Sequence, residues 1–586
     1  MKKALKFRLL LIFTMVLIMV FYIKVFGKAN LIIGLMVFIA ALLNLGNDLS
    51  YKPKASFVKL LVLLLILGIG AYINSPITSF GCVLTFFIVF ATTFSSYHLF
   101  GTHVYRPFLV IYTIMVARPV GPEDLPMRLM SLAFGAVFIV GFNLVLNGKK
   151  YSNLNKYTVS SLIDEIIGAV ELKLDGKEVA IENFNVADGF YRSAFSKFEH
   201  KFFPTQKNES YLNIIKSLQF IGWVISKCDL SLNELNYIKI VLNDFKESKT
   251  FDIENIPVEH EEMNLVVLNL KVIKNELENS HDKTSDNIPD MKAVIGIVKP
   301  LVKRQFSFKS AKFTFAFKMA LVLTLCEIIT VLFNFPYATW LYFAAISIML
   351  PHIDDVLHSV KNRVIGTFVG SFAFLIILIA LPFIPISTKS YVGVALLVGT
   401  VGILLSIKNR PVRFFFMTVM SLSASLLCIA PPKAIELKIL WVFTAILVVN
   451  IINYGFLPFS IEKETKNNLK SSYKLNKQFV EMIKSKCEGK SSFNKTSLIV
   501  ISNMIRENIQ LTSENEELYY LQSKIINISY TILNYMEIYE LSDEMKDEMI
   551  KIIDGGKFKD NNSPLLYSLN HVVELLDYEK ELINNL

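Results

Sequence analysis

The ionisable residues that stand most clearly inside apolar stretches long enough to cross a lipid bilayer, in this 586-residue chain, are Lys318 and Glu327. A charge at that depth costs a few kcal/mol, so each is a candidate for function by default. Lys318 stands about two helical turns from one end of its stretch, where its ammonium could bind a carboxylate or reach the headgroups as an anchor. Glu327 stands farther in, where it could carry a proton or form an ion pair with Lys438.

Basic and aromatic residues stand at the ends of the neighbouring apolar stretches. A cation in this position either holds the helix end at the membrane surface or attracts an anion. Both interpretations are open for Arg363, which would form an anion entrance together with Lys361, Arg410 and Arg413. Trp340 opens another stretch, where its ring could lie among the headgroups or stack on an aromatic acid.

Small residues follow Arg363 at helical spacing. Gly366 and Gly370 are four residues apart, with Thr367 between them, so one face of this helix carries no side chain where another helix could approach. The first interpretation is helix packing. The second is a hinge or a close passage for a substrate.

Four residues with metal-binding side chains stand close together, His352, Asp354, Asp355 and His358. On a helix Asp355 shares a face with each histidine, but the two histidines do not share one. The segment also follows a proline at the end of an apolar stretch. We therefore favour a solvated loop over a metal site and expect no metal.

The sequence lacks the motifs of enzymes and of ATP-driven transport. No nucleophile stands with a base, and there is no phosphate-binding glycine loop or Walker lysine. The five cysteines show no paired spacing, which argues against a disulfide framework and against a zinc site. We expect no enzymatic activity and no cofactor.

Apolar and polar blocks alternate twice along the chain. Hydrophobic residues make up 53% of it and the mean hydropathy is +0.47, which is more than one soluble core needs. The layout predicts an all-α integral membrane protein of two six-span helical repeats, about twelve transmembrane helices, each repeat followed by a cytosolic helical domain. The predicted membrane domains are 1–147 and 312–458, and the predicted helical domains are 148–311 and 459–586.

The apolar runs set the predicted spans, since about 20 apolar residues cross the hydrocarbon as a helix. In the first half they are 9–26, 30–46, 57–73, 77–94, 107–119 and 129–146. In the second half they are 313–333, 335–351, 364–382, 390–407, 412–430 and 438–457. The fifth run is the shortest, and a re-entrant segment is the alternative there.

Basic residues gather at alternate ends of these spans. The positive-inside rule therefore places both termini and both polar segments in the cytosol, in a protein of the plasma membrane. Anchoring at the lipid bilayer then explains the net charge of +10. We expect no nucleic-acid partner, because the basic residues form no stripe with interleaved aromatics. A homo-oligomer is left open.

A shift of 310 residues lays parts of the first half on the second. The coincident residues are basic or polar, and the pairs are Arg8 with Lys318, Arg128 with Lys438 and Asn143 with Asn453. The match indicates an internal duplication. Because each half holds an even number of spans, the copies would have parallel topology and be related by an axis along the membrane normal.

The second half also contains the motif of a known family. Its residues, in chain order, are Phe335, Pro336, Tyr337, Trp340, Pro351, Asp354, Arg363, Gly366, Thr367 and Gly370. An aromatic-proline start, a tryptophan, a proline at the end of the span and an arginine before a Gly-Thr-x-x-Gly helix resemble the fusaric acid resistance and aromatic acid exporter superfamily. The first half follows only in part, since no tryptophan stands near Asn30 and Lys54 replaces the arginine.

This resemblance implies a secondary exporter of small, often aromatic, organic acids. A more distant likeness to the plant aluminium-activated malate transporters leaves passive anion conduction open. Our first hypothesis is proton-linked export of an organic anion through a pathway between the repeats, with Lys318, Arg363 and Arg410 as cationic hosts. The alternatives are an organic-anion channel and a non-transporting scaffold or sensor whose helical segments bind partners.

Overall fold

The computed structural model is helical throughout the residues that it describes, and no strand occurs among them. The described residues are 2–46, 49, 53–74, 79–96, 104–152, 154–177, 206–247, 253, 256–260, 262–278, 306–308, 310–333, 337–383, 387–405, 409–426, 430–490, 516–556 and 563–585. The all-α prediction is therefore confirmed for this part of the chain. The predicted Phe335-Pro336 start of a span lies outside it.

The chain forms two compact units, and each is built from two separate stretches of sequence. Unit 1 comprises Met1–Gly148 and Arg304–Ile461, and unit 2 comprises Lys149–Lys303 and Glu462–Leu586. The two apolar blocks thus share one unit and the two polar blocks share the other. The division into two membrane and two cytosolic domains stays a prediction.

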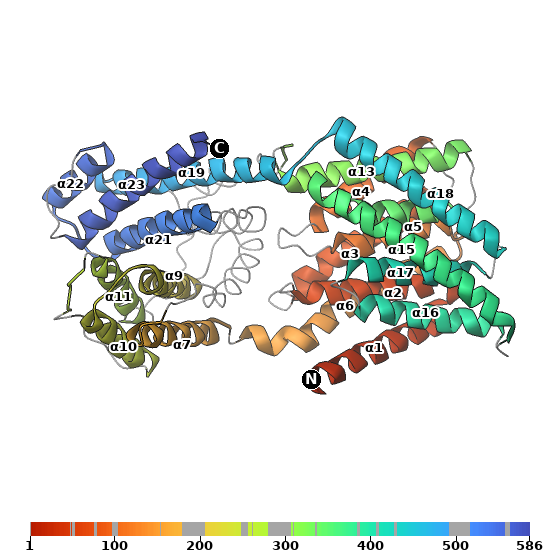
Figure 1. Cartoon of the computed structure of the whole chain (residues 1–586), viewed down its shortest axis with the longest axis horizontal. Helices are drawn as coiled ribbons and strands as arrows, with labels where there is room; N and C mark the ends of the chain where they lie inside the picture. The colour runs from red at the N-terminus through yellow and green to blue at the C-terminus, as the bar shows by residue number, and fades with distance from the viewer. Residues whose placement is uncertain are drawn as a thin grey trace. The chain divides into compact units, whose positions relative to one another are not determined.

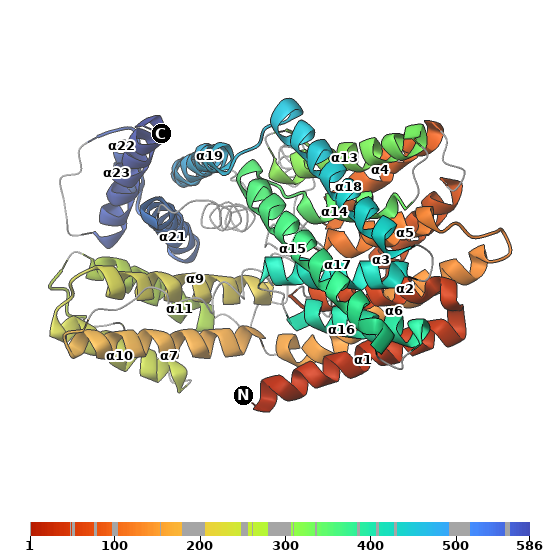
Figure 2. The same ribbon diagram turned by 45° about the vertical axis from the view of Figure 1, so that its right-hand side comes forward.

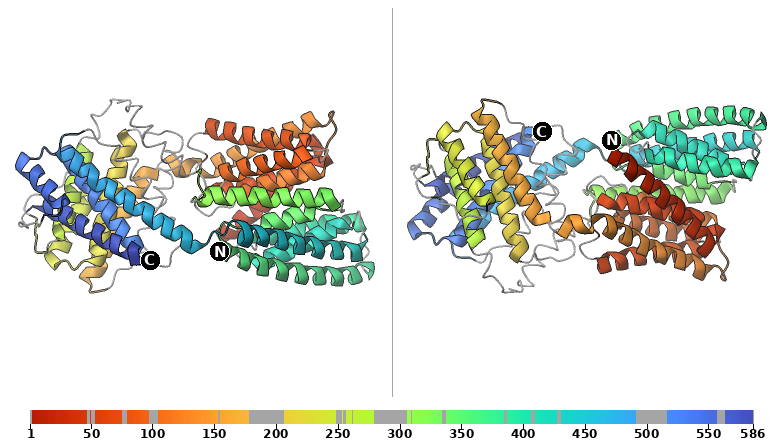
Figure 3. Two further views of the ribbon diagram at one scale, coloured as in Figure 1. Left: turned by 90° about the horizontal axis from the view of Figure 1, so that it is seen from above. Right: turned by 90° about the horizontal axis from the view of Figure 1, so that it is seen from below.

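Unit 1 contains the apolar helices, which lie side by side and run in about the same direction (Figures 1 and 3). In the first half they are α1 (Lys2–Phe26), α2 (Leu31–Leu43), α3 (Pro53–Ile73), α4 (Ser79–Ser96), α5 (Tyr105–Ala117) and α6 (Leu125–Ser152). In the second half they are α13 (Ala311–Phe333), α14 (Thr339–Ile348), α15 (Ile353–Ala380), α16 (Thr388–Leu405), α17 (Arg410–Ser425) and α18 (Pro431–Asn450). A π-helical turn at Ile451–Phe456 extends α18.

Among the described residues of unit 1, five stretches are long and apolar enough to cross a membrane, which supports a membrane location. They are Ser56–Ile73, Leu125–Leu146, Ala311–Phe333, Ile353–Phe383 and Pro431–Phe456. Six further apolar helices are shorter, and α17 is in neither group. Each predicted span overlaps a helix, but the arrangement of twelve spans in two repeats remains a prediction.

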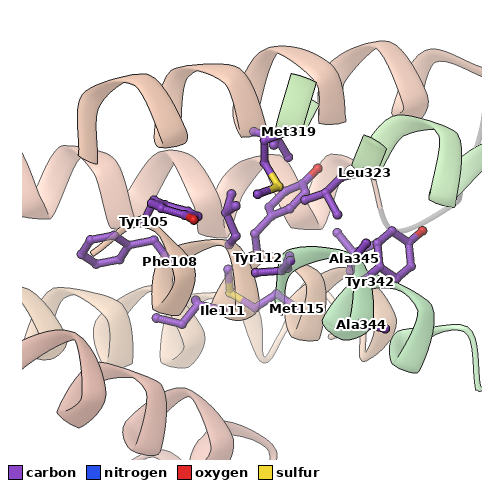
Figure 4. Packing of buried hydrophobic residues seen from close by; sticks show 14 of the residues in the cluster. Tyr105, Phe108, Ile111, Tyr112, Met115, Met319, Leu323, Tyr342, Ala344 and Ala345 are labelled. Atoms are coloured by element: carbon purple, nitrogen blue, oxygen red, sulfur yellow. The ribbon is translucent and has the colours of Figure 1, made fainter. Parts of the chain in front are cut away.

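The short helices α5 and α14 lie in the core of unit 1. They have 13 and 10 residues, about 20 Å and 15 Å at the helical rise, which is less than the hydrocarbon thickness. Figure 4 shows Tyr112 of α5 among Met319 and Leu323 of α13, with Tyr342 of α14 beside them. Most residues of both helices are buried among protein side chains, and the end of α5 at Ala117 is exposed. A re-entrant α5 stays open.

The two halves of unit 1 also meet along an aromatic seam between α4 and α13, which run side by side (Figure 1). The rings of Phe86 and Phe317 lie 5.5 Å apart, and those of Phe90 and Phe313 lie 5.4 Å apart, both edge to face. Edge-to-face rings pack favourably beyond their buried area. The seam is thus a close-packed contact between the halves.

The start of α15 corrects the prediction of a solvated loop. The helix begins at Ile353 rather than near 364, so Asp354 and Asp355 lie in its first turn, where the helix dipole favours negative charge. Asp354 Oδ2 accepts a hydrogen bond of 3.0 Å from the backbone N–H of Ile461. The His352 ring stacks on Phe459 with the ring centres 6.1 Å apart. No group of three metal-binding side chains occurs in the described part of the chain.

Gly366 and Gly370 lie where α15 approaches α17, and the two helices run side by side in Figure 1. A Cβ added at Gly366 would lie 2.5 Å from the Cβ of Phe414, and one at Gly370 would lie 2.8 Å from the Cβ of Thr418. Both distances are shorter than non-bonded carbons allow. The glycines therefore permit the close contact that the packing interpretation describes.

Unit 2 is a helical assembly to which both polar blocks contribute (Figure 2). Its helices are α7 (Leu154–Leu174), α9 (Gln206–Lys227), α10 (Leu232–Lys246), α11 (Met263–Glu278), α19 (Ile461–Cys487), α21 (Glu516–Ile538), α22 (Asp543–Ile553) and α23 (Pro564–Asn585). Polar bonds join the blocks, since Lys216 Nζ donates to Asn527 Oδ1 at 3.1 Å and Thr531 Oγ1 donates to Asn269 Oδ1 at 2.9 Å. The apolar faces of both blocks form one shared core.

A carboxyl group lies buried in this shared core. Glu579 of α23 accepts hydrogen bonds from Asn476 Nδ2 at 2.9 Å and from Gln522 Nε2 at 3.2 Å. Burial raises the pKa of the Glu579 carboxyl to about 7, and the two hydrogen bonds oppose this rise only in part. His571 on the same helix behaves in the opposite sense, because burial lowers its pKa to about 4. The fold of unit 2 thus favours the neutral form of both groups.

Gly366→Ala should lower the thermal unfolding midpoint of the detergent-solubilised protein. The added methyl group would collide with Phe414 and cost about 1–3 kcal/mol as overpacking. Gly393→Ala on α16 is the matched control, because a Cβ there meets no atom within 4 Å. Equal midpoints for the two variants would contradict a close contact between α15 and α17.

Glu579→Gln should change how the stability of the protein depends on pH. The folded-state pKa of about 7 lies above the ordinary value of 4.5, so the contribution of Glu579 is fully present below pH 4.5 and is lost as the pH rises through 7. The difference is about 3 kcal/mol. The variant, compared with the unmodified protein by thermal unfolding from pH 4.5 to 8, should therefore gain relative stability as the pH rises. A constant difference across this range would contradict a buried carboxyl of raised pKa.

Candidate functional site

Three cationic side chains are buried inside the second half of unit 1. Lys318 of α13 has 0% of its surface exposed, Arg363 of α15 has 1% and Lys438 of α18 has 2%. Buried cations are usually paired with carboxylates, since an isolated charge is costly to remove from water. The partners of each of these residues therefore decide what it can do.

Lys438 lies against an aromatic face. Its Nζ is 4.8 Å from the centre of the Trp340 ring, within the range of a cation–π contact. Trp340 itself is only 8% exposed, so protein side chains enclose most of its ring. No ion pair links Lys438 to Glu327 or to any other carboxylate in the described residues.

Arg363 lies close to Lys438 and against another aromatic ring. The two positive charges repel each other electrostatically. The guanidinium carbon of Arg363 is 5.1 Å from the centre of the Phe414 ring, and that of Arg413 is 5.7 Å from it. Nε and Nη1 of Arg363 are buried without a hydrogen-bond partner. Within the described residues Arg363 forms no ion pair with a carboxylate either.

Trp340 stands at the start of α14, a helix end with two unusual features. Tyr337 adopts a φ of 61°, the left-handed region that a bulky residue rarely occupies. The residue before the helix, Ala338, offers no side-chain cap to its first N–H groups. The positive end of the helix dipole and the Lys438 ammonium thus meet at Trp340.

These residues form what we term the cation pair site, Arg363 and Lys438 with the aromatic rings of Trp340 and Phe414. It holds two positive charges and hydrogen-bond donors without acceptors, beside two aromatic faces. A carboxylate would neutralise one charge and accept from the unpartnered guanidinium. An attached aromatic ring could stack on Trp340 or Phe414. The chemistry suits a small organic acid.

Lys318 is separate from this arrangement. Its Nζ donates to Asn453 Oδ1 at 3.0 Å, and Asn453 lies in the π-helical turn after α18. Asn453 is held in turn by Nδ2 bonds to Val449 O at 3.0 Å and to Met349 Sδ at 3.2 Å. Lys318 is thus buried and hydrogen-bonded, and its side chain does not reach toward the headgroups as an anchor would.

Glu327 lies in a polar network formed mainly by the first half. Asn74 Nδ2 donates to Glu327 Oε1 at 2.7 Å and to Thr85 Oγ1 at 2.9 Å, and Thr85 Oγ1 lies 2.7 Å from Tyr112 OH. The Asn74 amide fits because Gly81 leaves room for it, since a Cβ there would lie 1.8 Å from Asn74 Oδ1. Glu327 Oε2 is buried without a partner. We term this set the carboxyl network. It replaces the predicted ion pair with Lys438.

Arg410, the remaining predicted cationic host, is the first residue of α17 and only half-buried. It acts electrostatically on Arg413, one turn farther along, and not on the cation pair. Lys361, which was also predicted to belong to the anion entrance, is exposed. The structure therefore brings Trp340 and Arg363 together and leaves Lys318, Glu327 and Arg410 elsewhere in unit 1.

The sequence interpretation missed Lys438 as a member of the cation pair site, although the shift of 310 residues contained the signal. Lys438 corresponds to Arg128, and Trp340 corresponds to Asn30. In the first half Arg128 Nε donates to Asn30 Oδ1 at 3.3 Å and Nη1 donates to Arg118 O at 2.7 Å. The cation of the sixth helix thus contacts the corresponding residue in both halves. The sequence contained no such signal for the other members of the two sites, Phe414, Asn74, Thr85 and Tyr112.

The comparison with known families falls on the half that contains this site. Residues 323–452 match the family described as fusaric acid resistance protein-like. The matched residues all lie in the second half of unit 1, so the predicted resemblance of this half to the family is confirmed. The match includes Glu327 and all four residues of the cation pair site. No curated protein and no solved structure matches the chain.

The fusaric acid resistance-like domain supports a membrane transporter of the resistance-type efflux kind, in a family of transporters and not of enzymes. The match begins at residue 323 and ends at residue 452, so it covers no part of the first half of unit 1 and no part of unit 2. The likeness to plant malate transporters stays a prediction.

Lys438→Met should raise the thermal unfolding midpoint of the protein in detergent, because it removes a buried charge that no carboxylate balances. The gain should be a few kcal/mol at most. Saturating benzoate should raise the midpoint of the unmodified protein and not that of the variant. Lys433→Met, an exposed change on the same helix, should behave as the unmodified protein. A variant that is less stable yet responds fully to benzoate would show that Lys438 is structural.

Proposed function

We propose that this protein exports a small organic anion, with aromatic acids among its substrates, across the plasma membrane in exchange for protons. The observation that carries the proposal is the cation pair site. Arg363 lies buried against the Phe414 ring and Lys438 against the Trp340 ring, and neither forms an ion pair with a carboxylate in the described residues. The family match of the same half supports efflux as the direction.

An anionic substrate completes the electrostatics of the cation pair site. The two cations repel each other when the site is empty, and a bound carboxylate would relieve this repulsion. Binding would be strong only where water is excluded, and Arg363 has only 1% of its surface exposed. A single carboxylate would leave about one positive charge, which would favour release once the site opens to water. Arg413 and Arg410 would attract the anion toward α17.

The carboxyl network is our candidate for proton coupling. Glu327 is 1% exposed, and its hydrogen-bond partners are neutral. A carboxylate charge in this setting carries an uncompensated cost that a neutral carboxyl avoids. Glu327 would therefore take up a proton when its surroundings open to one side and release it on the other. The network joins α4 and α5 of the first half to α13, so this proton step would change the contact between the halves.

The orientation in the membrane is part of the proposal. Basic residues at alternate helix ends favour an orientation with both termini and the polar segments in the cytosol. The anion would then enter from the cytosol, and protons would move inward as it leaves. Everted membrane vesicles present this cytosolic surface to the medium.

Uptake of radiolabelled benzoate into everted vesicles tests the proposal. We expect uptake that depends on a proton gradient, acid inside, and that Glu327→Gln reduces at least tenfold. Benzoate should still raise the unfolding midpoint of this variant, since Glu327 lies outside the cation pair site. Glu436→Gln, an exposed carboxyl on α18, is the control and should leave uptake unchanged.

Two results would contradict proton-linked export. Benzoate movement that follows the membrane voltage and ignores the proton gradient would identify a channel. Unchanged uptake by Glu327→Gln would remove the carboxyl network from the mechanism. Absence of benzoate movement together with absence of a benzoate-dependent midpoint shift would argue against this substrate class.

A further inference from the structure

A stripe of polar side chains follows Arg363 along α15. Thr367 and Ser371 stand four and eight residues after it, so the three share one helix face. Their exposed fractions are 1%, 2% and 4%, which makes the stripe an interior feature of unit 1. At the helical rise it extends about 12 Å from the arginine toward the C-terminal end of the helix.

The hydroxyl groups of this stripe have no hydrogen-bond partners. Thr367 Oγ1 and Ser371 Oγ are buried and unpaired, as are Nε and Nη1 of Arg363. Other buried hydroxyls of the neighbouring helix α17 bond to carbonyls of their own helix. Thr418 Oγ1 donates to Phe414 O at 2.9 Å, and Ser425 Oγ donates to Leu422 O at 2.6 Å. The hydroxyls of the stripe are thus left available to another group.

Unpaired polar groups in an apolar interior need an explanation. Each costs about 1–3 kcal/mol when nothing replaces its water, and buried polar groups in proteins are nearly always satisfied. In a membrane protein, interior polar residues in a row mark a path for water or substrate. Three in register on one helix face therefore point to a hydrated track.

The corresponding helix of the first half has no such stripe. The shift of 310 residues places Pro53, Phe57 and Leu61 where Arg363, Thr367 and Ser371 stand. Counting instead from Lys54, which replaces the arginine, gives Val58 and Val62 at the hydroxyl positions. In both alignments the two hydroxyl positions are apolar. Whatever uses the stripe acts in the second half alone.

We propose that the anion crosses the membrane along α15, from Arg363 past Thr367 to Ser371, within the second half of unit 1. This inference rests on the proposed export of organic anions and locates its route. The hydroxyls donate hydrogen bonds to the carboxylate oxygens after these leave the guanidinium. The route replaces the pathway between the halves that the repeat alone suggests.

The contact between the halves is poorly suited to an anion. It contains Glu327, whose carboxylate would repel the substrate, and the close-packed ring pairs of α4 and α13. The α15 stripe lies instead beside the cation pair site, since Arg363 belongs to both. The anion route and the carboxyl network thus share no residue: the route follows α15, and the network joins α13 to α4 and α5.

Cysteine accessibility tests the route in the full-length protein. In a variant without its five native cysteines, Thr367→Cys and Ser371→Cys should react with a negatively charged methanethiosulfonate reagent in everted vesicles. Saturating benzoate should slow the reaction at least threefold. Phe372→Cys is the matched control on α15, because Phe372 is 65% exposed on the apolar surface and lipid would exclude a charged reagent.

The outcomes separate this route from the proposed function. Absence of reaction at both positions in vesicles that still take up benzoate would overturn the route and leave export intact. Reaction without protection by benzoate would also overturn it, since the stripe would then carry water only. Reaction with protection would support it, and so would the absence of reaction at the first-half positions Phe57→Cys and Leu61→Cys.

A hydroxyl deletion gives a test that does not depend on labelling. Thr367→Val keeps the shape of the side chain and removes its hydroxyl. It should raise the KM for benzoate uptake about threefold to tenfold, and Thr367→Ser should restore it. A valine variant of normal abundance and unchanged KM and kcat would overturn a role for this hydroxyl.

Discussion

Positive charge that is buried without a carboxylate beside it is the constraint on which the proposed mechanism depends. Removing a cation from water is costly, and proteins ordinarily offset the cost with an opposite charge. Around Arg363 and Lys438 the described residues supply aromatic faces instead. A cation–π contact recovers only part of the lost hydration. The positive charge of the site is therefore left unbalanced, and a bound anion would neutralise part of it.

The two halves provide different partners for the buried cation at corresponding positions. Arg128 of the first half bonds to the Asn30 side chain and to a backbone carbonyl, so its donors are occupied within the protein. Lys438 meets Trp340 at the same place, and an aromatic face accepts no conventional hydrogen bond from it. If the halves arose by duplication, this difference would assign a scaffold role to the first half and the substrate to the second. The family match of residues 323–452 falls on the same side of that division.

The buried carboxyl group and the buried cation pair of unit 1 lie in separate sites. Glu327 lies in the contact between the halves, in the network with Asn74, Thr85 and Tyr112. The cation pair contacts the aromatic rings of Phe414 on α17 and Trp340 on α14. Separation keeps the carboxyl from pairing with the cations, and such a pair would remove both the anion site and the proton site. Lys318 lies with Asn453 and takes part in neither. Unit 2, with its shared core and its buried Glu579, contributes no residue to these sites.

Much of the fold class and part of the site were accessible from the sequence. Hydrophobic content and helix-length apolar runs predicted a helix that overlaps each of the apolar helices described in unit 1, because a backbone in lipid must satisfy its own hydrogen bonds. The same runs marked Lys318 and Glu327, since a charge stands out in an apolar stretch, and the spacing of Gly366 and Gly370 indicated a close helix contact. The start of α15 was missed because its first turns are polar and resemble a loop.

The partners of these residues were decided by tertiary structure. Glu327 and Asn74 are far apart in the chain, and only the packing of α13 against the first half brings the amide to the carboxyl in place of Lys438. Trp340 looked like a residue of the membrane surface because it opens an apolar run, and only the packing of α14 against α18 places Lys438 on its ring. Apolar periodicity depends on the local backbone alone, and so the sequence determined which segments are helical. Contacts depend on how helices of different length are arranged around one another, and so only the folded chain determined which charges stay unpaired.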